Sequence, residues 1–235
     1  MNLKGKVALL TGGARMGLAL GQELAKRGCA VVFTWKNSRR AAEEAGFAIH
    51  ADLEKEKDVK NLAQVLQKKY RGLDILIHMA SRYEKLPLPH LRWKIWQKSM
   101  TSELGSAFLT AQTVIPLMKK RPSGRILFIS DWIAASGRPR YRDYLPYYVA
   151  KRALLGLAEC LALELSPRIL VNCIAPGPIL PPPGMSLKEN AQVMRQTPLR
   201  RWGGPGEIAK AALFLLETDF VTGECLRVDG GRHLF

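Results

Sequence analysis

Short apolar runs alternate with helical patterns along the whole sequence, and this alternation constrains the fold more than any other feature. The apolar runs are rich in Val, Ile, Leu and Phe and predict buried strands at residues 7–10, 30–34, 47–50, 75–79, 125–129 and 169–174. Helical periodicity fills the intervals at residues 18–27, 57–70, 104–119, 147–165 and 207–216. Strands and helices that alternate in this way predict a parallel sheet with helices on both faces.

Nothing in the sequence marks a boundary between two domains. The chain has 235 residues, which fits one large α/β domain, and it shows neither a composition break nor an internal repeat. We therefore expect a single domain over residues 1–235, built on a doubly wound parallel sheet of about seven strands.

A Pro-rich stretch begins at Pro176 and cannot form a helix or a central strand. We expect a substrate loop over about residues 177–200, with a plain surface loop as the alternative.

A glycine-rich turn follows the first predicted strand and opens the first predicted helix. Its sequence is Thr11-Gly12-Gly13-Ala14-Arg15-Met16-Gly17. Glycines let backbone amides approach a pyrophosphate, and the start of a helix favours its negative charge. In this position the turn predicts a Rossmann-type dinucleotide site, and a tight turn that binds no ligand is the alternative.

The end of the second predicted strand distinguishes between two dinucleotides. Sites that prefer NAD usually carry an acidic residue there, which holds the ribose 2′-hydroxyl. This chain instead has basic and polar residues, namely Lys36, Asn37, Ser38 and Arg39. Cations at this point favour NADP(H) because they can bind the 2′-phosphate, although they would also suit a solvated basic surface. Asp52, after the third strand and before Leu53, suits an acceptor for the adenine amino group or a helix N-cap.

Tyr147 and Lys151 lie four residues apart in a predicted helix and therefore share one face of it. A nearby ammonium group favours the phenolate, so we expect Lys151 to lower the pKa of Tyr147. A tyrosine prepared in this way can act as a general acid or base. The pair follows the fifth predicted strand, at the end of the sheet where the dinucleotide is expected.

With these motifs, the chain resembles the short-chain dehydrogenase/reductase family over essentially its whole length. In that family the tyrosine donates a proton, the lysine binds the nicotinamide ribose, and Pro-Gly after the sixth strand closes on the nicotinamide. The resemblance implies NADP(H) contacts at Gly12, Arg15, Met16, Gly17, Asp52, Leu53, Ala80, Ser81, Tyr147, Lys151, Pro176, Gly177 and Ile179. It also implies a homotetramer.

Two residues favour the pteridine reductases and dihydromonapterin reductases within this family. Most members have a serine where this chain has Asp131, whereas pteridine reductases have an aspartate there. They also have an aromatic residue at the position of Tyr83, which stacks on the pterin ring. An aspartate beside a tyrosine can relay a proton to a ring nitrogen while hydride adds to carbon. The implied substrate contacts are Arg15, Ser81, Tyr83, Asp131, Tyr147, Pro178 and Leu180, with Asp131, Tyr147 and Lys151 as the catalytic residues.

Each of these assignments has an alternative. Asp131 could be a turn or cap residue, in which case Ser130 would serve as the family's serine. Tyr83 could be a half-buried loop aromatic. Arg15 aligns either with a residue that contacts the 2′-phosphate or with one that contacts the substrate, because the glycine turn is one residue shorter than usual.

Other departures from the family lie around the expected site. His78-Met79 replaces the usual Asn-Asn, and Glu103 stands where the family often has a structural asparagine that supports a water relay. The segment between Asp131 and Tyr147 is about three residues longer than usual and contains residues 138–143. We expect this insertion to flank the substrate entrance and to alter specificity.

The formal net charge of +16 is high for a metabolic enzyme. The basic clusters are dispersed and no nucleic-acid motif accompanies them, so we expect a solvated surface that attracts anionic cofactors rather than nucleic acid. No apolar run reaches the roughly 20 residues that span a bilayer, so no membrane association is expected. The four cysteines are scattered among apolar neighbours, which is typical of reduced thiols in the cytoplasm, and no metal-ligand spacing is present.

The leading interpretation is therefore an NADPH-dependent reductase of a pteridine-type substrate such as dihydropterin, dihydromonapterin or dihydrofolate. One alternative is a carbonyl or 3-oxoacyl-carrier-protein reductase, whose acidic carrier a basic surface would attract. A second alternative is a non-catalytic nucleotide-binding regulator on the same fold, because a fold does not by itself determine function.

Overall fold

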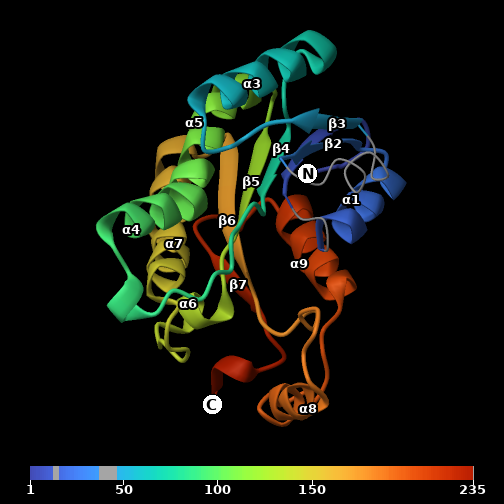
Figure 1. Cartoon of the computed structure of the whole chain (residues 1–235). Coiled ribbons are helices and arrows are strands. Elements are labelled where there is room, and N and C mark those ends of the chain that lie inside the picture. Colours follow the sequence, from blue (N-terminus) through green and yellow to red (C-terminus); the bar gives the residue numbers. More distant parts are fainter. Residues whose placement is uncertain (13–15, 37–46, 235) are drawn as a thin grey trace.

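Seven parallel strands form one sheet in the computed structural model, which describes residues 1–12, 16–36 and 47–234 (Figure 1). The strands follow the order β3-β2-β1-β4-β5-β6-β7. Their bounds are β1 Val7–Thr11, β2 Ala30–Trp35, β3 Phe47–His50, β4 Ile75–His78, β5 Gly124–Ile129, β6 Ile169–Pro176 and β7 Cys225–Val228. The single doubly wound domain predicted from the sequence is confirmed.

Helices cover both faces of this sheet (Figure 1). One face carries α3 Glu56–Tyr70, α4 Trp93–Met100, α5 Ser106–Met118 and α7 Leu145–Leu165, and the other carries α1 Met16–Lys26 and α9 Pro205–Glu217. Successive strand residues point to opposite faces, so Leu9 packs under α3, α5 and α7 while Ala8 and Leu10 pack under α1 and α9. Burial on both faces explains why the strands are continuous apolar runs in the sequence.

The sheet reverses its strand order at β1, which has β2 on one side and β4 on the other. A crevice at the carboxyl ends of such strands is the usual ligand position in open α/β sheets. Thr11 pairs in register with His78 there, so the turn at Gly12 runs directly beside Ala80. Gly12 has a φ of +66°, and a Cβ atom at that residue would lie 2.7 Å from the Ala80 Cα atom. Only glycine satisfies both conditions.

The structure contains helices that the periodicity did not predict. These are α4, the short α6 Trp132–Ser136 after β5, and α8 Leu187–Arg195 within the expected substrate loop. A signal for α8 was present, since Ser186 and Glu189 form a capping box at its start. The position of β7 was not predicted from the sequence, because Arg227 interrupts this short apolar run. None of the described helices is long and apolar enough to cross a membrane.

The interior packing yields a prediction for stability. Leu62 on α3 is fully buried in the larger core cluster, whereas Leu187 at the start of α8 is 88% exposed. Leu62→Ala should lower the free energy of unfolding by about 2–5 kcal/mol, because it removes buried methyl groups and leaves a cavity. The same substitution at Leu187 should have little effect. Urea unfolding of both variants tests this, and equal losses would contradict the packing described here.

Candidate active site

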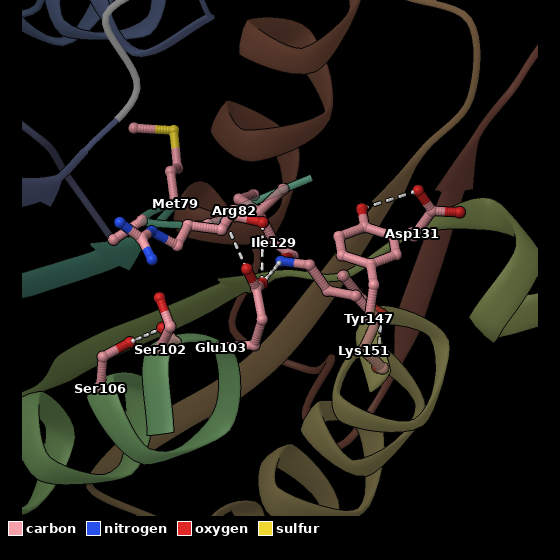
Figure 2. A network of polar contacts seen from close by, with 12 residues as sticks. Met79, Arg82, Ser102, Glu103, Ser106, Ile129, Asp131, Tyr147 and Lys151 are labelled. Atoms are coloured by element: carbon pink, nitrogen blue, oxygen red, sulfur yellow. Dashed lines mark hydrogen bonds and ion pairs between the residues drawn. The ribbon is translucent and has the colours of Figure 1, made fainter. Parts of the chain in front are cut away.

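Tyr147 and Lys151 lie on the first two turns of α7 and meet residues from three other segments (Figure 2). The Tyr147 hydroxyl donates a hydrogen bond to Asp131 Oδ2 at 3.0 Å. The Lys151 ammonium donates to the carbonyl of Ile129 at 2.9 Å and lies 3.2 Å from Glu103 Oε2. Lys151 and Glu103 are both buried, so each charge depends on the other for compensation.

Asp131 is both a helix cap and the hydrogen-bond partner of Tyr147. It is the N-cap of α6, where its Oδ1 atom accepts a hydrogen bond from the backbone N–H of Ile133 at 2.8 Å. Its other oxygen accepts from Tyr147. Ser130 points elsewhere, since its hydroxyl donates to the backbone carbonyl of Lys151 at 2.8 Å. Burial raises the pKa of Asp131, which favours a carboxyl group that can hold a proton.

The pKa of Tyr147 shifts upward, opposite to the lowering expected from Lys151 alone. Burial raises the pKa of Tyr147 well above its ordinary value, and the neighbouring Asp131 and Glu103 raise it further. The sequence indicated Lys151 and Asp131 beside the tyrosine, but it did not indicate the ion pair between Lys151 and Glu103. In the structure Glu103 offsets the Lys151 ammonium, and Asp131 accepts the phenol's hydrogen bond. The phenol form of Tyr147 is therefore favoured.

Glu103 is held in place from several directions. It lies on a π-helical turn, Thr101–Gly105, between α4 and α5. Its carboxylate accepts hydrogen bonds from the Ser81 hydroxyl at 2.8 Å and from the backbone N–H of Arg82. Such turns often occur at functional sites. The sequence marked Glu103 as a departure from the family but did not reveal its contact with Lys151, which joins residues 48 positions apart in the chain.

His78 links three elements beneath the crevice. Its Nδ1 atom lies 3.0 Å from the Thr11 hydroxyl, and its Nε2 atom lies 3.3 Å from the Ser106 hydroxyl. Burial and the nearby Lys151 charge lower the pKa of His78 to about 3. The imidazole is therefore neutral at physiological pH and acts as a hydrogen-bonding spacer between β1, β4 and α5.

A cavity of about 400 Å³ opens beside Tyr147 and Lys151. Many of its lining residues were expected from the sequence, namely Met16, Ser81, Tyr83, Asp131, Pro176, Gly177, Pro178, Ile179 and Leu180. Others were not expected, including Trp132, Tyr141, Met185, Val193, Trp202 and Arg232. Val193 of α8 thus contributes to the wall, and part of the expected substrate loop is helical.

Aromatic side chains gather on one wall of this cavity. Tyr83 stacks on Tyr144 with ring centroids 4.5 Å apart and meets the edge of Tyr147 at 5.0 Å. One face of Tyr83 is therefore already covered, although the side chain is 56% exposed. The insertion at residues 138–143 brings Tyr141 to this wall, with its ring 6.4 Å from Trp132. The insertion flanks the cavity, as expected.

Arg232 is a cavity residue that the sequence analysis missed. It is buried near the end of the chain, its guanidinium lies 5.4 Å from the Trp132 ring, and it donates to the Val193 carbonyl at 2.8 Å. It also donates to Gln196 at 3.0 Å. Arg232 therefore fixes α8 against the wall of the cavity, a role without a local sequence signal.

A second cavity of about 260 Å³ lies on the other side of Met79 and Ser81. It is lined by residues expected to contact the dinucleotide, namely Gly12, Lys36, Leu53, Ala80 and Ser81. Lys36 and Asp52 are joined to each other, with 2.8 Å between the ammonium and Oδ1, and this hydrogen bond raises the pKa of Lys36. Arg15, Asn37, Ser38 and Arg39 lie outside the described residues.

A doubly wound sheet with a crevice at its switch point and a Tyr/Lys pair on one adjoining helix defines a class of nicotinamide-dependent oxidoreductases. The chain belongs to the short-chain dehydrogenase/reductase family. The sequence family described as Enoyl-(Acyl carrier protein) reductase matches residues 13–233. Within the described residues, no group of three or more His, Cys, Asp or Glu side chains is placed to hold a metal ion.

Similar proteins extend over the whole chain. The 3-oxoacyl-(acyl-carrier-protein) reductase FabG of Escherichia coli is 30% identical and covers 100% of both chains. That of Aquifex aeolicus is 31% identical and covers 98% of both. A solved short-chain dehydrogenase/reductase of Serratia marcescens, a double mutant, has a TM-score of 0.90 at 28% identity, covering 99% of this chain and 100% of the other. The two bacterial relatives are 3-oxoacyl-(acyl-carrier-protein) reductases and not pteridine reductases, so they support reductase chemistry but not the finer resemblance to pteridine reductases.

The neutral state of His78 gives a pH prediction. The unfolded chain binds a proton on this histidine below about pH 6.5, whereas the folded chain binds it only near a pKa of about 3. The contribution of His78 to stability is therefore complete above pH 6.5 and is lost as the pH falls towards 3. Between pH 7 and pH 5 the wild type should lose about 2 kcal/mol more than His78→Asn.

The measurement is urea unfolding across this pH range, with His90→Asn as the control because His90 is exposed. His90→Asn should follow the wild type. An identical pH dependence in His78→Asn and the wild type would contradict a buried neutral His78.

Proposed function

We propose that the protein is an NADPH-dependent reductase of a pteridine-type ring, such as a dihydropterin. The observation that carries this proposal is the 3.0 Å hydrogen bond from Tyr147 to the half-buried Asp131. Reduction of a ring C=N bond requires hydride at carbon and a proton at nitrogen. A phenol coupled to a carboxyl group that can hold a proton suits the nitrogen end of that bond.

The residues of the crevice fit a nicotinamide dinucleotide. Gly12 and the start of α1 would receive the pyrophosphate, and Lys36 would face the ribose phosphate of NADP(H). Lys151 would hold the nicotinamide ribose. Pro176 and Gly177 would cover the nicotinamide at the end of β6, where a Cβ atom on residue 177 would lie 2.5 Å from the Asp229 Cβ. The bound dinucleotide supplies the hydride.

The protein's own groups handle the proton. Tyr147 donates its hydroxyl proton to the ring nitrogen, and a protonated Asp131 can restore the phenol through the hydrogen bond that joins them. The edge of Tyr83 and the rings of Tyr141 and Trp132 form an apolar wall for a flat ring. The cavity of about 400 Å³ is in the range of small-molecule sites.

A second candidate is reduction of a 3-oxoacyl group carried by an acidic carrier protein. The names of the full-length bacterial relatives favour this candidate over the first. The net charge of +16 would also attract an acidic partner. Asp131 at the position where most family members have serine favours the pteridine ring.

We also propose a homotetramer in the cytoplasm, as the family resemblance implies.

The two candidates differ in how they depend on Asp131. With NADPH and a dihydropterin, Asp131→Ser should lose about 10²-fold or more in kcat, since it removes the carboxyl partner of Tyr147. Tyr147→Phe should lose a similar factor or more, while NADPH binding measured by fluorescence stays near that of the wild type. Tyr148→Phe, one residue further along α7, is the matched control and should remain active.

Steady-state NADPH oxidation with a dihydropterin and with an acetoacetyl thioester decides between the candidates. Turnover of the thioester alone, retained or improved in Asp131→Ser, would replace the first candidate with the second. NADPH binding without turnover of either substrate would identify a non-catalytic regulator. Full activity of Tyr147→Phe would refute the role of that residue.

A further inference from the structure

The Lys151 ammonium beside Tyr147 is paired with a carboxylate (Figure 2). Figure 2 shows Glu103 reaching from its π-helical turn to the Lys151 ammonium, while Asp131 meets the tyrosine hydroxyl from the other side. Lys151 Nζ lies 5.6 Å from the centroid of the Tyr147 ring but only 3.2 Å from Glu103 Oε2. The ammonium is therefore paired with the carboxylate at much closer range than with the phenol.

We propose that Glu103 is a positioning residue that neutralises Lys151 and so keeps Tyr147 in its phenol form, ready to donate a proton during reduction. This inference rests on the proposed reductase function. It assigns to Glu103 a role that acts through Lys151, because Glu103 contacts the lysine, Ser81 and Arg82 and makes no hydrogen bond to Tyr147 in the described part of the chain.

Hydrogen bonds hold both carboxylate oxygens of Glu103 in place. One oxygen accepts from the Ser81 hydroxyl and the other accepts from the Arg82 backbone N–H. Glu103 and Lys151 are each about 2% exposed. Opposite charges about 3 Å apart attract strongly when water is excluded. The carboxylate of Glu103 therefore neutralises the Lys151 ammonium locally, and solvent screens this interaction little.

His78 and Tyr83, which also lie near Tyr147, carry no negative charge that could neutralise the Lys151 ammonium in place of Glu103. His78 is neutral, and Tyr83 is an uncharged phenol whose pKa is raised mainly by burial. Asp131 raises the pKa of Tyr147, in the same direction as Glu103. In the described part of the chain, the titratable groups that face Tyr147 or Lys151 include Glu103 from the π-helical turn, Asp131 before α6, Tyr83 from the segment after β4, Tyr144 before α7, His78 from β4 and Cys173 from β6. Among charged side chains, Arg82, Glu84 and Lys98 line a cavity with Tyr147, and Arg140 and Arg232 line cavities with both Tyr147 and Lys151.

The consequence concerns the alkaline limit of the reaction. A general acid fails when the pH exceeds its pKa, because the proton that it should donate is lost. With Glu103 in place, Lys151 does little to draw the proton off Tyr147. Without the carboxylate charge, the unpaired ammonium would favour the phenolate, and reduction would decline at a lower pH.

The test is the pH dependence of kcat at saturating NADPH in wild type, Glu103→Gln and Glu103→Asp. The wild-type rate should persist to about pH 10, the ordinary pKa of tyrosine, or beyond. In Glu103→Gln the alkaline decline should begin about one pH unit or more lower, which corresponds to about a tenfold loss at high pH. Glu103→Asp keeps the charge and should restore the wild-type profile.

Glu84→Gln is the matched control, because it removes the same charge within the same neighbourhood. Glu84 and Glu103 line one cavity of about 130 Å³, but the Glu84 carboxylate lies 3.8 Å from Arg82 Nη1 and is about half exposed. Its substitution should leave the profile unchanged. An equal shift in Glu84→Gln would overturn the proposal in favour of general surface electrostatics.

A second readout needs no substrate and separates this inference from the proposed function. Ultraviolet difference titration of each protein against its Tyr147→Phe counterpart reports when Tyr147 ionises. Ionisation should occur at lower pH in the Glu103→Gln background and should return towards wild type with Glu103→Asp. If Tyr147 titrates at the same pH in all three backgrounds, the role of Glu103 is overturned whatever the substrate proves to be. The role is also overturned if Glu103→Gln and Glu103→Asp lose activity equally without a shift in the pH profile.

Discussion

The rest of the site depends on one buried charge, the ammonium of Lys151. A charge removed from water needs both a counter-charge and hydrogen-bond partners, because its desolvation is otherwise too costly for a folded protein. Lys151 meets this demand with the Glu103 carboxylate and the Ile129 carbonyl. Those two partners join α7 to the end of β5 and to the π-helical turn before α5, so the lysine fixes three elements around the tyrosine.

The parallel sheet makes that arrangement possible. All seven strands run in one direction, and the segments that follow them therefore meet at the same edge. Gly12 follows β1, Ser81 follows β4, Asp131 follows β5 and Gly177 follows β6. The apolar strands hold these segments in register, and the polar side chains beyond their ends are free to differ between relatives of one fold.

Much of this could be predicted from the sequence, and the failures have a common cause. Strand runs, the glycine turn, and the Tyr147–Lys151 spacing are local patterns, so each carries its own signal. The Glu103–Lys151 pair and the Arg232–Val193 contact join distant residues, and no local pattern encodes them. The pKa of Tyr147 was misjudged for the same reason, since its direction depends on burial and on a carboxylate 44 positions away in the sequence.

The buried pair also constrains how such a protein can change over evolutionary time. Replacing either Glu103 or Lys151 alone would strand the other charge in the interior, and breaking a buried pair on one side commonly costs about 3–5 kcal/mol. A lineage that has acquired both residues therefore meets a barrier to losing either. In this protein, replacement of Glu103 by an uncharged residue therefore calls for new contacts that compensate the buried Lys151 ammonium.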